Sequence, residues 1–346
     1  MPKKKHILVI RLSAMGDVAM TVPVLRALLL QHPEVKITVL SRPFFEPFFE
    51  DIPNLNFFSI DLKKRHKGFL GLLRLFSDLR KLNIDKVADL HNVLRSKVIT
   101  SLFALSGKNV AATNKGRADK KALTRAENKI FEPVISMFER HATTFSKLGF
   151  NLDLSHPVFP KKAVLSPAIL TIIGKEYKKL IGIAPFAQYE SKVYPLDLMQ
   201  EVIDNLAKEE SCKILLFGGG AQEIKKLEKL CNSHKNVIVV AGKIKFKEEL
   251  NLISNLDIML SMDSGNAHIA AKLGVKVITL WGATHPFAGF KPFNQPFENC
   301  ITANRVKYPL LPTSVYGNKE VVGYKEVMRT ILPETVATII KNILRT

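Results

Sequence analysis

Short apolar runs alternate with segments of helical periodicity along nearly the whole chain, and this alternation limits the possible folds more than any other feature. The expected strands are residues 6–10, 36–41, 85–91, 108–113, 180–186, 212–220, 236–242, 257–265 and 275–282. The expected helices between them are residues 22–32, 69–82, 95–106, 131–149, 196–209, 221–234, 246–255 and 266–274. Repeated strand–helix–strand units form parallel sheets covered by helices on both faces. The sequence therefore predicts an α/β fold of doubly wound parallel sheets.

A segment rich in proline separates two halves of this pattern. Residues 151–168, NLDLSHPVFPKKAVLSPA, carry three prolines and little periodicity, as linkers do. With 346 residues, the chain is long enough for two domains. We expect Rossmann-like domains at residues 1–160 and 161–346 with a cleft between them. A final helix at 333–345 belongs to the second domain or packs back on the first. Residues 114–129 form a loop or an exposed helix start, and residues 283–320 are irregular.

The chain is strongly basic, which points to an anionic partner. It has 51 Lys and Arg against 31 Asp and Glu, a formal charge of +20. Nucleic acid, an acidic membrane surface or a phosphorylated substrate each fits such a charge, and so does a merely basic, solvated surface. A nucleic-acid surface interleaves basic and aromatic residues. Here there are one Trp and six Tyr, and the 21 Phe fall mostly in apolar runs. This distribution disfavours nucleic acid.

Other features indicate a cytoplasmic chain. The start MPKKK is followed by only four apolar residues before Arg11, too few for a signal peptide, so we interpret it as a basic lead-in to the first strand. No run of 18 apolar residues is present. The three cysteines, Cys212, Cys231 and Cys300, are isolated, which fits reduced thiols rather than disulfides or a zinc site.

The glycine-rich turns do not carry a dinucleotide fingerprint. The segment FGGGAQE at 217–223 follows an expected strand and allows a nucleotide to approach the backbone closely, although a tight turn without a ligand explains it as well. Neither it nor the turn after the first strand reads GxGxxG, so a nicotinamide-dependent oxidoreductase is disfavoured. A Walker A motif, a GxSxG elbow and a DxD pair are also missing from the sequence.

Residues 262–274, MDSGNAHIAAKLG, suit a diphosphate. A strand ends at Asp263, Ser264 and Gly265 make the turn, and a helix begins near Asn266. The N–H groups and dipole of a helix start attract anions, and His268 lies in the first turn. Asp263 or Ser264 acting only as an N-cap, with a structural His268, is the alternative.

Two further charged residues follow strands. Lys192 lies after the strand at 180–186, at the edge where open α/β sheets bind ligands, and could neutralise a diphosphate leaving group unless it is merely solvated. Asp17 follows the first strand at a place where a phosphate-binding loop would carry glycine. A carboxylate there suits proton transfer, unless Asp17 caps the helix through Val22–Leu29. Thr21 could provide that cap instead, with Pro23 in the first turn.

Two segments resemble a known family. MGDVAMTVPVLRAL at 15–28 and MDSGNAHIAAKLGVKVITLWGATHP at 262–286 are similar to the two signatures of the family 9 glycosyltransferases, the heptosyltransferase group. The resemblance implies a GT-B architecture in which the N-terminal domain binds the acceptor and the C-terminal domain binds the nucleotide sugar. It further implies inverting, metal-independent transfer of a heptose or related sugar from an ADP-sugar to the inner core of lipopolysaccharide.

The resemblance also implies roles for individual residues. Asp17 corresponds to the proposed catalytic base. The donor-binding positions that it implies are Lys192, Gly218, Gly219, Gln222, Glu223, Ile244, Asp263, Ser264, Gly265 and His268. No metal and no cofactor besides the nucleotide sugar is expected. Another nucleotide sugar and glycan acceptor are the alternative substrates.

The expected acceptor is an anionic, lipid-linked glycan, which gives the basic charge a candidate meaning. The expected helix at 69–82 follows Lys63, Lys64, Arg65, His66 and Lys67. It either meets such a surface, with peripheral contact at the cytoplasmic face of the inner membrane, or simply packs on its own sheet.

Overall fold

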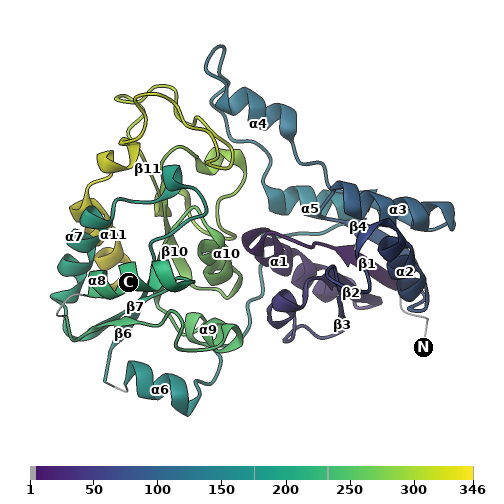
Figure 1. The fold of residues 1–346 in the computed structure, drawn as a ribbon, viewed down its shortest axis with the longest axis horizontal. Helices are drawn as coiled ribbons and strands as arrows, with labels where there is room; N and C mark the ends of the chain where they lie inside the picture. Colours follow the sequence, from purple (N-terminus) through teal and green to yellow (C-terminus); the bar gives the residue numbers. More distant parts are fainter. Residues whose placement is uncertain (1–4, 175, 232–233, 346) are drawn as a thin grey trace. The chain divides into compact units, whose positions relative to one another are not determined.

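The computed structural model describes residues 5–174, 176–231 and 234–345, so the basic lead-in at 1–4 lies outside the described residues. The chain forms two compact units, coloured along the sequence in Figure 1. Unit 1 comprises Met1–Lys115 and Ile135–Phe159, and unit 2 comprises Gly116–Val134 and Pro160–Thr346. The first expected domain, residues 1–160, thus includes a segment, 116–134, that belongs to unit 2.

Unit 1 contains a five-stranded parallel sheet in the order β3-β2-β1-β4-β5. Its strands are β1 (Lys5–Ile10), β2 (Val35–Ser41), β3 (Leu55–Ser59), β4 (Lys86–Asp89) and β5 (Asn109–Ala112). Its α-helices are α1 (Met15–Gln31), α2 (Gly68–Arg80), α3 (Leu94–Leu105) and α5 (Met137–Ser146), with a 3-10 turn at Pro43–Phe48.

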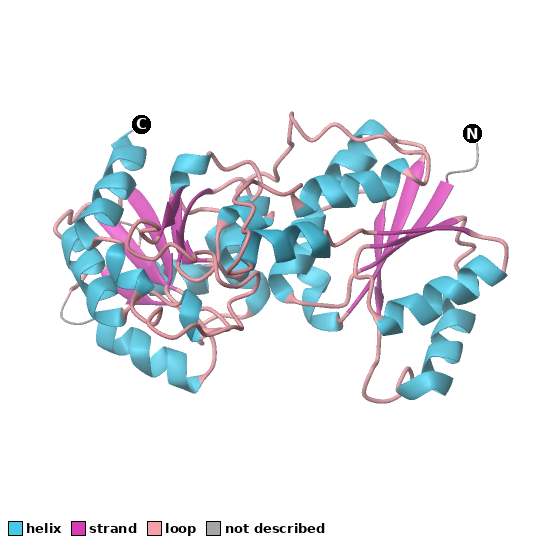
Figure 2. Ribbon diagram, turned by 90° about the horizontal axis from the view of Figure 1, so that it is seen from above, coloured by secondary structure: helices cyan, strands magenta, loops and turns pink. Residues whose placement is uncertain are grey.

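The residue pattern of unit 1 explains its layers. Along β1, Leu8 and Ile10 alternate onto one face, where they join a buried cluster with Leu75 of α2 and Phe103 of α3. Helices α1 and α5 pack on each other and on the sheet, and Figure 2 shows helices on both faces of this sheet. A sheet covered on both faces needs strands with continuous apolar runs, as β1 has from Ile7 to Ile10.

Unit 2 contains a six-stranded parallel sheet in the order β11-β10-β9-β6-β7-β8. Its strands are β6 (Lys179–Ala184), β7 (Cys212–Leu216), β8 (Val237–Val239), β9 (Ile258–Met262), β10 (Lys276–Trp281) and β11 (Cys300–Thr302). Its α-helices are α4 (Arg117–Thr124), α6 (Pro167–Ile173), α7 (Leu196–Ala207), α8 (Ala221–Cys231), α9 (Phe246–Ile253), α10 (Gly265–Lys272) and α11 (Pro333–Arg345). Counted within the unit, this is the Rossmann strand order. The two parallel sheets confirm the predicted fold class.

The structure differs from the sequence-based expectation in several elements. Strands β3 and β11 were not expected, and β11 lies in the segment 283–320 that looked irregular. Helix α5 covers only part of 131–149, because residues 131–134 belong to unit 2. The expected helix at 221–234 is seen to Cys231, and residues 232–233 lie outside the described part. Helix α11 packs on α7, and Val336 and Ile340 join the core of unit 2, so the final helix does not leave that unit.

The first helix also begins earlier than expected. The sequence placed its start near Val22, whereas α1 begins at Met15 and contains Pro23. Val18, Val22 and Leu25 are buried at helical spacing, and this burial stabilises the helix in the residues before the proline as well. This moves Asp17 from the expected loop into the first turn of a helix.

Among the helices within the described residues, none combines the length and apolar character that a membrane crossing requires.

Candidate functional site

Each sheet has one point where the chain connections diverge, and open α/β sheets bind ligands beside that point, at the carboxyl ends of the strands. In unit 1 it lies between β1 and β4, where Ile10 is paired with Asp89. Arg11 and Leu90 therefore leave the sheet at the same level. In unit 2 it lies between β6 and β9, where Ala184 is paired with Ser261.

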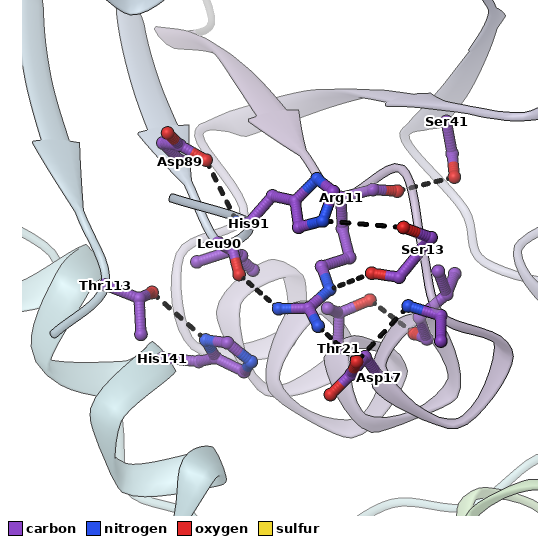
Figure 3. A network of polar contacts seen from close by, with 12 residues as sticks. Arg11, Ser13, Asp17, Thr21, Ser41, Asp89, Leu90, His91, Thr113 and His141 are labelled. Carbon is purple, nitrogen blue, oxygen red and sulfur yellow. Dashed lines mark hydrogen bonds and ion pairs between the residues drawn. The ribbon is translucent and has the colours of Figure 1, made fainter. Parts of the chain in front are cut away.

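Arg11 ties the two strand ends of unit 1 together (Figure 3). Its guanidinium is buried and donates from Nη1 to Leu90 O at 2.6 Å and from Nε to Ser13 O at 2.8 Å. Its Nη2 lies 2.5 Å from Asp17 Oδ2. The backbone carbonyl of Arg11 accepts a hydrogen bond from Ser41 Oγ of β2. One arginine thus fixes the loop after β1 and the carboxylate that follows it.

Asp17 is the third residue of α1 and takes part in capping that helix. Its Oδ2 accepts from the Ala14 N–H at 3.2 Å, which is a capping interaction at the helix start. Its side chain remains 32 % exposed while paired with Arg11. The alternative in which Thr21 caps this helix is wrong, because Thr21 lies inside α1 and donates from Oγ1 to Val18 O.

His91 lies beside this pair and was not among the expected site residues. Its Nε2 is 3.5 Å from Ser13 Oγ, and its backbone N–H donates to Asp89 Oδ1 at 2.9 Å. Burial, with the nearby charge of Arg11, lowers the pKa of His91 to about 4, so the ring is neutral at neutral pH. The only signal in the sequence is the polar end of the expected strand 85–91.

A second polar cluster forms at the carboxyl edge of the sheet in unit 2. Lys192 ends a short 3-10 turn, Glu190–Lys192, in the loop that follows β6. Its Nζ lies 3.0 Å from Oδ2 of Asp263, the residue after β9. Thr284 Oγ1 donates to the same oxygen at 2.9 Å. Both members of the ion pair are largely buried. The structure thus places in contact two residues that were predicted separately from the sequence.

Thr284 and Gly317 are two contributors to this cluster that the prediction did not name. Thr284 stands inside the quoted segment 262–286, so the sequence held a signal for it. Gly317 has φ +84°, and a Cβ there would lie 2.5 Å from Lys192 Cδ. Its carbonyl accepts from Ser191 Oγ at 2.7 Å. A close approach of this kind, in a segment without periodicity, leaves no pattern to recognise.

The start of α10 adjoins the Lys192–Asp263 pair. Gly265 is the first helical residue, one position earlier than expected, and Ser264 is the N-cap. The Oγ of Ser264 lies 3.1 Å from Ser261 Oγ, and no described residue caps the first turn through its side chain. The N–H groups there suit an anion. His268 is buried in the same turn of the helix.

The glycine-rich turn after β7 reaches the same edge of the sheet, because β7 is the neighbour of β6. Glu223 Oε2 accepts from the Gly219 N–H at 2.8 Å, and Gly218 packs closely against that carboxylate and Phe186. Glu223 therefore closes the turn, while its neighbour Gln222 is exposed. Ile244 is half-buried in the loop after β8.

The site prediction thus divides between the two units. Lys192 and Asp263 touch, Ser264, Gly265 and His268 belong to the adjoining helix start, and Gly218, Gly219 and Glu223 form the next turn along the sheet. Asp17 belongs to unit 1 with Arg11 and His91. Within residues 5–174, 176–231 and 234–345, no three His, Cys, Asp or Glu side chains are grouped to hold a metal ion.

Solved structures resemble this fold over its whole length. A family 9 glycosyl transferase from Veillonella parvula superposes with a TM-score of 0.74 at 19 % identity, covering 99 % of this chain and 98 % of that one. The E. coli heptosyltransferase WaaC, solved with ADP, gives a TM-score of 0.66 at 18 % identity, with 98 % and 99 % covered. At these identities the likeness concerns the fold, and these neighbours support the predicted GT-B architecture.

Sequence comparison reaches curated enzymes as well. The lipopolysaccharide core heptosyltransferase OpsX of Haemophilus influenzae is 24 % identical over 312 residues, which are 86 % of this chain and 84 % of that protein. Lipopolysaccharide heptosyltransferase 3 of Escherichia coli is 23 % identical over 278 residues, with 78 % and 81 % covered. Residues 72–320 match the profile of glycosyltransferase family 9 (heptosyltransferase), well over half of the chain. The chain therefore belongs to glycosyltransferase family 9 and is a glycosyltransferase.

Proposed function

We propose that the protein transfers a heptose, or a related sugar, from an ADP-sugar to an inner-core lipopolysaccharide acceptor. The observation that carries this proposal is the buried Lys192–Asp263 pair beside the start of α10, a constellation suited to a diphosphate. Curated relatives are named lipopolysaccharide heptosyltransferases, and WaaC has been solved with ADP and with ADP-2-deoxy-2-fluoro heptose. Another nucleotide sugar and another glycan acceptor are the second candidate pair of substrates.

Unit 2 binds the donor in this proposal. The diphosphate lies against the first N–H groups of α10 and draws Lys192 Nζ away from Asp263. The turn of Gly218, Gly219 and Glu223, with Ile244 beyond β8, borders the nucleoside. Asp263 and Thr284 hold Lys192 ready in the free enzyme, because the lysine and the threonine hydroxyl both bind Asp263 Oδ2.

The proposed reaction is an inverting displacement without a metal ion. An acceptor hydroxyl attacks the anomeric carbon on the face opposite the diphosphate. As the new C–O bond forms, the bond to the diphosphate oxygen breaks, ADP departs with the electron pair, and the hydroxyl proton passes to the Asp17 carboxylate. Lys192 and the α10 dipole stabilise the charge on the leaving group, the task that a divalent metal performs elsewhere.

The acceptor side belongs to unit 1. Arg11 pairs with the Asp17 carboxylate and orients it, and neutral His91 lies in the same cluster. Membership in a glycosyltransferase family decides against the oxidoreductase and nucleic-acid-binding alternatives. Since the proposed acceptor is lipid-linked, the enzyme would act at the cytoplasmic face of the inner membrane and contact that membrane peripherally.

The direct test incubates purified protein with ADP-heptose and a heptose-free inner-core acceptor, with and without EDTA. We expect one heptose mass increment, equal rates in both samples, and an inverted anomeric centre by NMR. Transfer that needs a divalent metal, or that retains the anomeric configuration, would contradict the mechanism. Transfer from other nucleotide sugars only would contradict the donor assignment.

A further inference from the structure

One face of unit 1 combines exposed apolar and basic side chains that the proposed reaction does not use. We define the basic–apolar patch as the exposed residues of the loop after β3 and of the first two turns of α2. On α2, Phe69 is 65 % exposed, Leu70 67 % and Leu73 37 %. The exposed basic members of the patch are Lys63, Lys64, Arg65, Lys67 and Arg74, of which Arg65 is paired with Asp78.

The fold of unit 1 does not need these apolar side chains. The opposite side of α2 carries Leu72, Leu75 and Leu79, which are buried in the core cluster with β1 and α3. The helix therefore packs on its own sheet, as one of the two sequence-based alternatives held. Phe69, Leu70 and Leu73 form a second, outward apolar stripe on the same helix.

The acidic residues beside the patch are already engaged. Asp61 accepts hydrogen bonds from the backbone N–H groups of Lys63, Lys64 and Arg65, which lower the pKa of its carboxyl. Asp78 binds Arg65 through two hydrogen bonds of 2.8 Å. None of Lys63, Lys64, Lys67 and Arg74 forms an ion pair with another described residue. The four charges are thus available to an external anion.

The loop holds these lysines in a fixed place relative to the apolar stripe. The buried ring of His66 accepts from the Asp61 N–H at 3.0 Å through Nδ1 and lies 3.4 Å from Asp78 Oδ2 through Nε2. At Gly71 the loop passes directly over α2, where an added Cβ would lie 2.3 Å from the His66 carbonyl carbon. The basic–apolar patch is therefore one preformed surface.

We propose that the basic–apolar patch docks on an anionic lipid surface, with Phe69 and Leu70 inserted among the headgroups and the lysines bound to lipid phosphates. Amphipathic surface helices bind membranes through this combination of buried apolar area and electrostatic attraction. A site for a soluble anion would bind through the charges and gain nothing from the apolar stripe. Each Lys or Arg near such a surface contributes about 1 kcal/mol, which is about fivefold in partitioning.

The test measures co-sedimentation of the full-length protein with vesicles of phosphatidylcholine alone or with phosphatidylglycerol. One variant, Phe69→Ser/Leu70→Ser, removes the apolar stripe. A second, Lys63→Gln/Lys64→Gln, changes only exposed loop side chains. The matched controls are Val322→Ser, at a valine 99 % exposed in unit 2, and Lys225→Gln/Lys229→Gln on exposed positions of α8. Thermal unfolding and ADP binding check that each variant is folded.

We expect the wild type to bind vesicles that contain phosphatidylglycerol, to dissociate from them when salt is added, and not to bind vesicles of phosphatidylcholine alone. The Lys63→Gln/Lys64→Gln variant should bind about 25-fold more weakly, and Phe69→Ser/Leu70→Ser should also lose binding, while both controls behave as wild type. Absence of wild-type binding, equal losses in the controls, or full binding by Phe69→Ser/Leu70→Ser would overturn the proposal. The last result would show that charge alone, without insertion of the apolar stripe, accounts for the binding. Because no sugar donor is used, failure here leaves the proposed transfer reaction standing, and failure of that reaction leaves this result intact.

Discussion

Arg11 Nη2 lies 2.5 Å from Asp17 Oδ2, and the same guanidinium donates to the carbonyls of Ser13 and Leu90. A helix-start carboxylate is thereby fixed to the ends of two neighbouring strands. An arginine so placed forms a charge-assisted contact with the carboxylate and sets its direction. We infer that Arg11 positions Asp17, and that both belong to one unit whose geometry is set by the sheet.

Replacing Arg11 by lysine tests this inference. A lysine keeps the charge but cannot hold three acceptors with a planar fork. We expect the free energy of unfolding to fall by about 1.5–3 kcal/mol and kcat to fall with it. Arg26→Lys is the matched control, since Arg26 lies on α1, as Asp17 does, and pairs with Asp51 outside that helix. Chemical denaturation and kcat measured on both variants check this, and equal kcat losses in the two would contradict a positioning role.

Gly317 and Gly323 form a matched pair for the Lys192 site. Both have positive φ, +84° and +81°, but a Cβ at Gly317 would lie 2.5 Å from Lys192 Cδ, whereas none of the described atoms lies within 4 Å of one at Gly323. Alanine strains the backbone at both positions. We expect only Gly317→Ala to weaken ADP binding, because it displaces Lys192. Calorimetric titration of the two variants measures this, and equal ADP affinities would count against it.

Lys192→Ala should have two separable effects. ADP affinity should fall about 10- to 150-fold, the equivalent of about 1.5–3 kcal/mol for a hydrogen bond to a charged group. Stability should fall as well, because buried Asp263 loses its counter-ion. Adding Asp263→Asn should recover stability without recovering affinity. Lys179→Ala, which breaks a more exposed 3.8 Å pair with Asp257, is the control. An unchanged ADP affinity in Lys192→Ala would remove the lysine from the donor site.

Much of this architecture was predictable, because apolar periodicity is a local signal. Strands such as β1 and β9 are mostly apolar, and the end of β9 placed Asp263 correctly at the start of the next turn. The start of α1 was not predicted, because Gly16 and Pro23 suggest a loop whereas burial of Val18 and Val22 keeps the helix. The roles of Arg11, His91 and Gly317 arise from contacts between segments distant in sequence. The local sequence around each of these residues therefore does not predict its role.

His285 predicts a pH dependence of stability. It is buried among Phe131, Phe287 and Phe297, and burial, aided by Arg305, lowers its pKa to about 4. The unfolded chain therefore binds a proton below about pH 6.5 that the folded protein resists. This contribution to stability is complete above pH 6.5 and is lost as the pH falls through 4. It amounts to about 3 kcal/mol at most.

Denaturant titrations of the wild type and His285→Phe between neutral and acidic pH measure this effect. The substitution leaves the Phe287 N–H without its acceptor, which lowers stability by an amount independent of pH. We expect the stability advantage of the wild type to shrink as the pH falls. A difference that stays constant with pH would show that His285 titrates normally.

The central claim is that Asp17 accepts the proton of the attacking hydroxyl, and kcat of Asp17→Asn tests it most directly. Asparagine retains an oxygen for the Ala14 N–H but not the negative charge. Asp51→Asn is the matched control, since it removes the carboxylate of the other Arg–Asp pair that involves a residue of α1. We predict that Asp17→Asn folds, binds ADP as the wild type does, and has a kcat lower by roughly 10²–10⁴, while Asp51→Asn keeps its kcat. A folded Asp17→Asn enzyme with near wild-type kcat and lowered stability would contradict the claim and leave Asp17 a helix-start and ion-pair residue only.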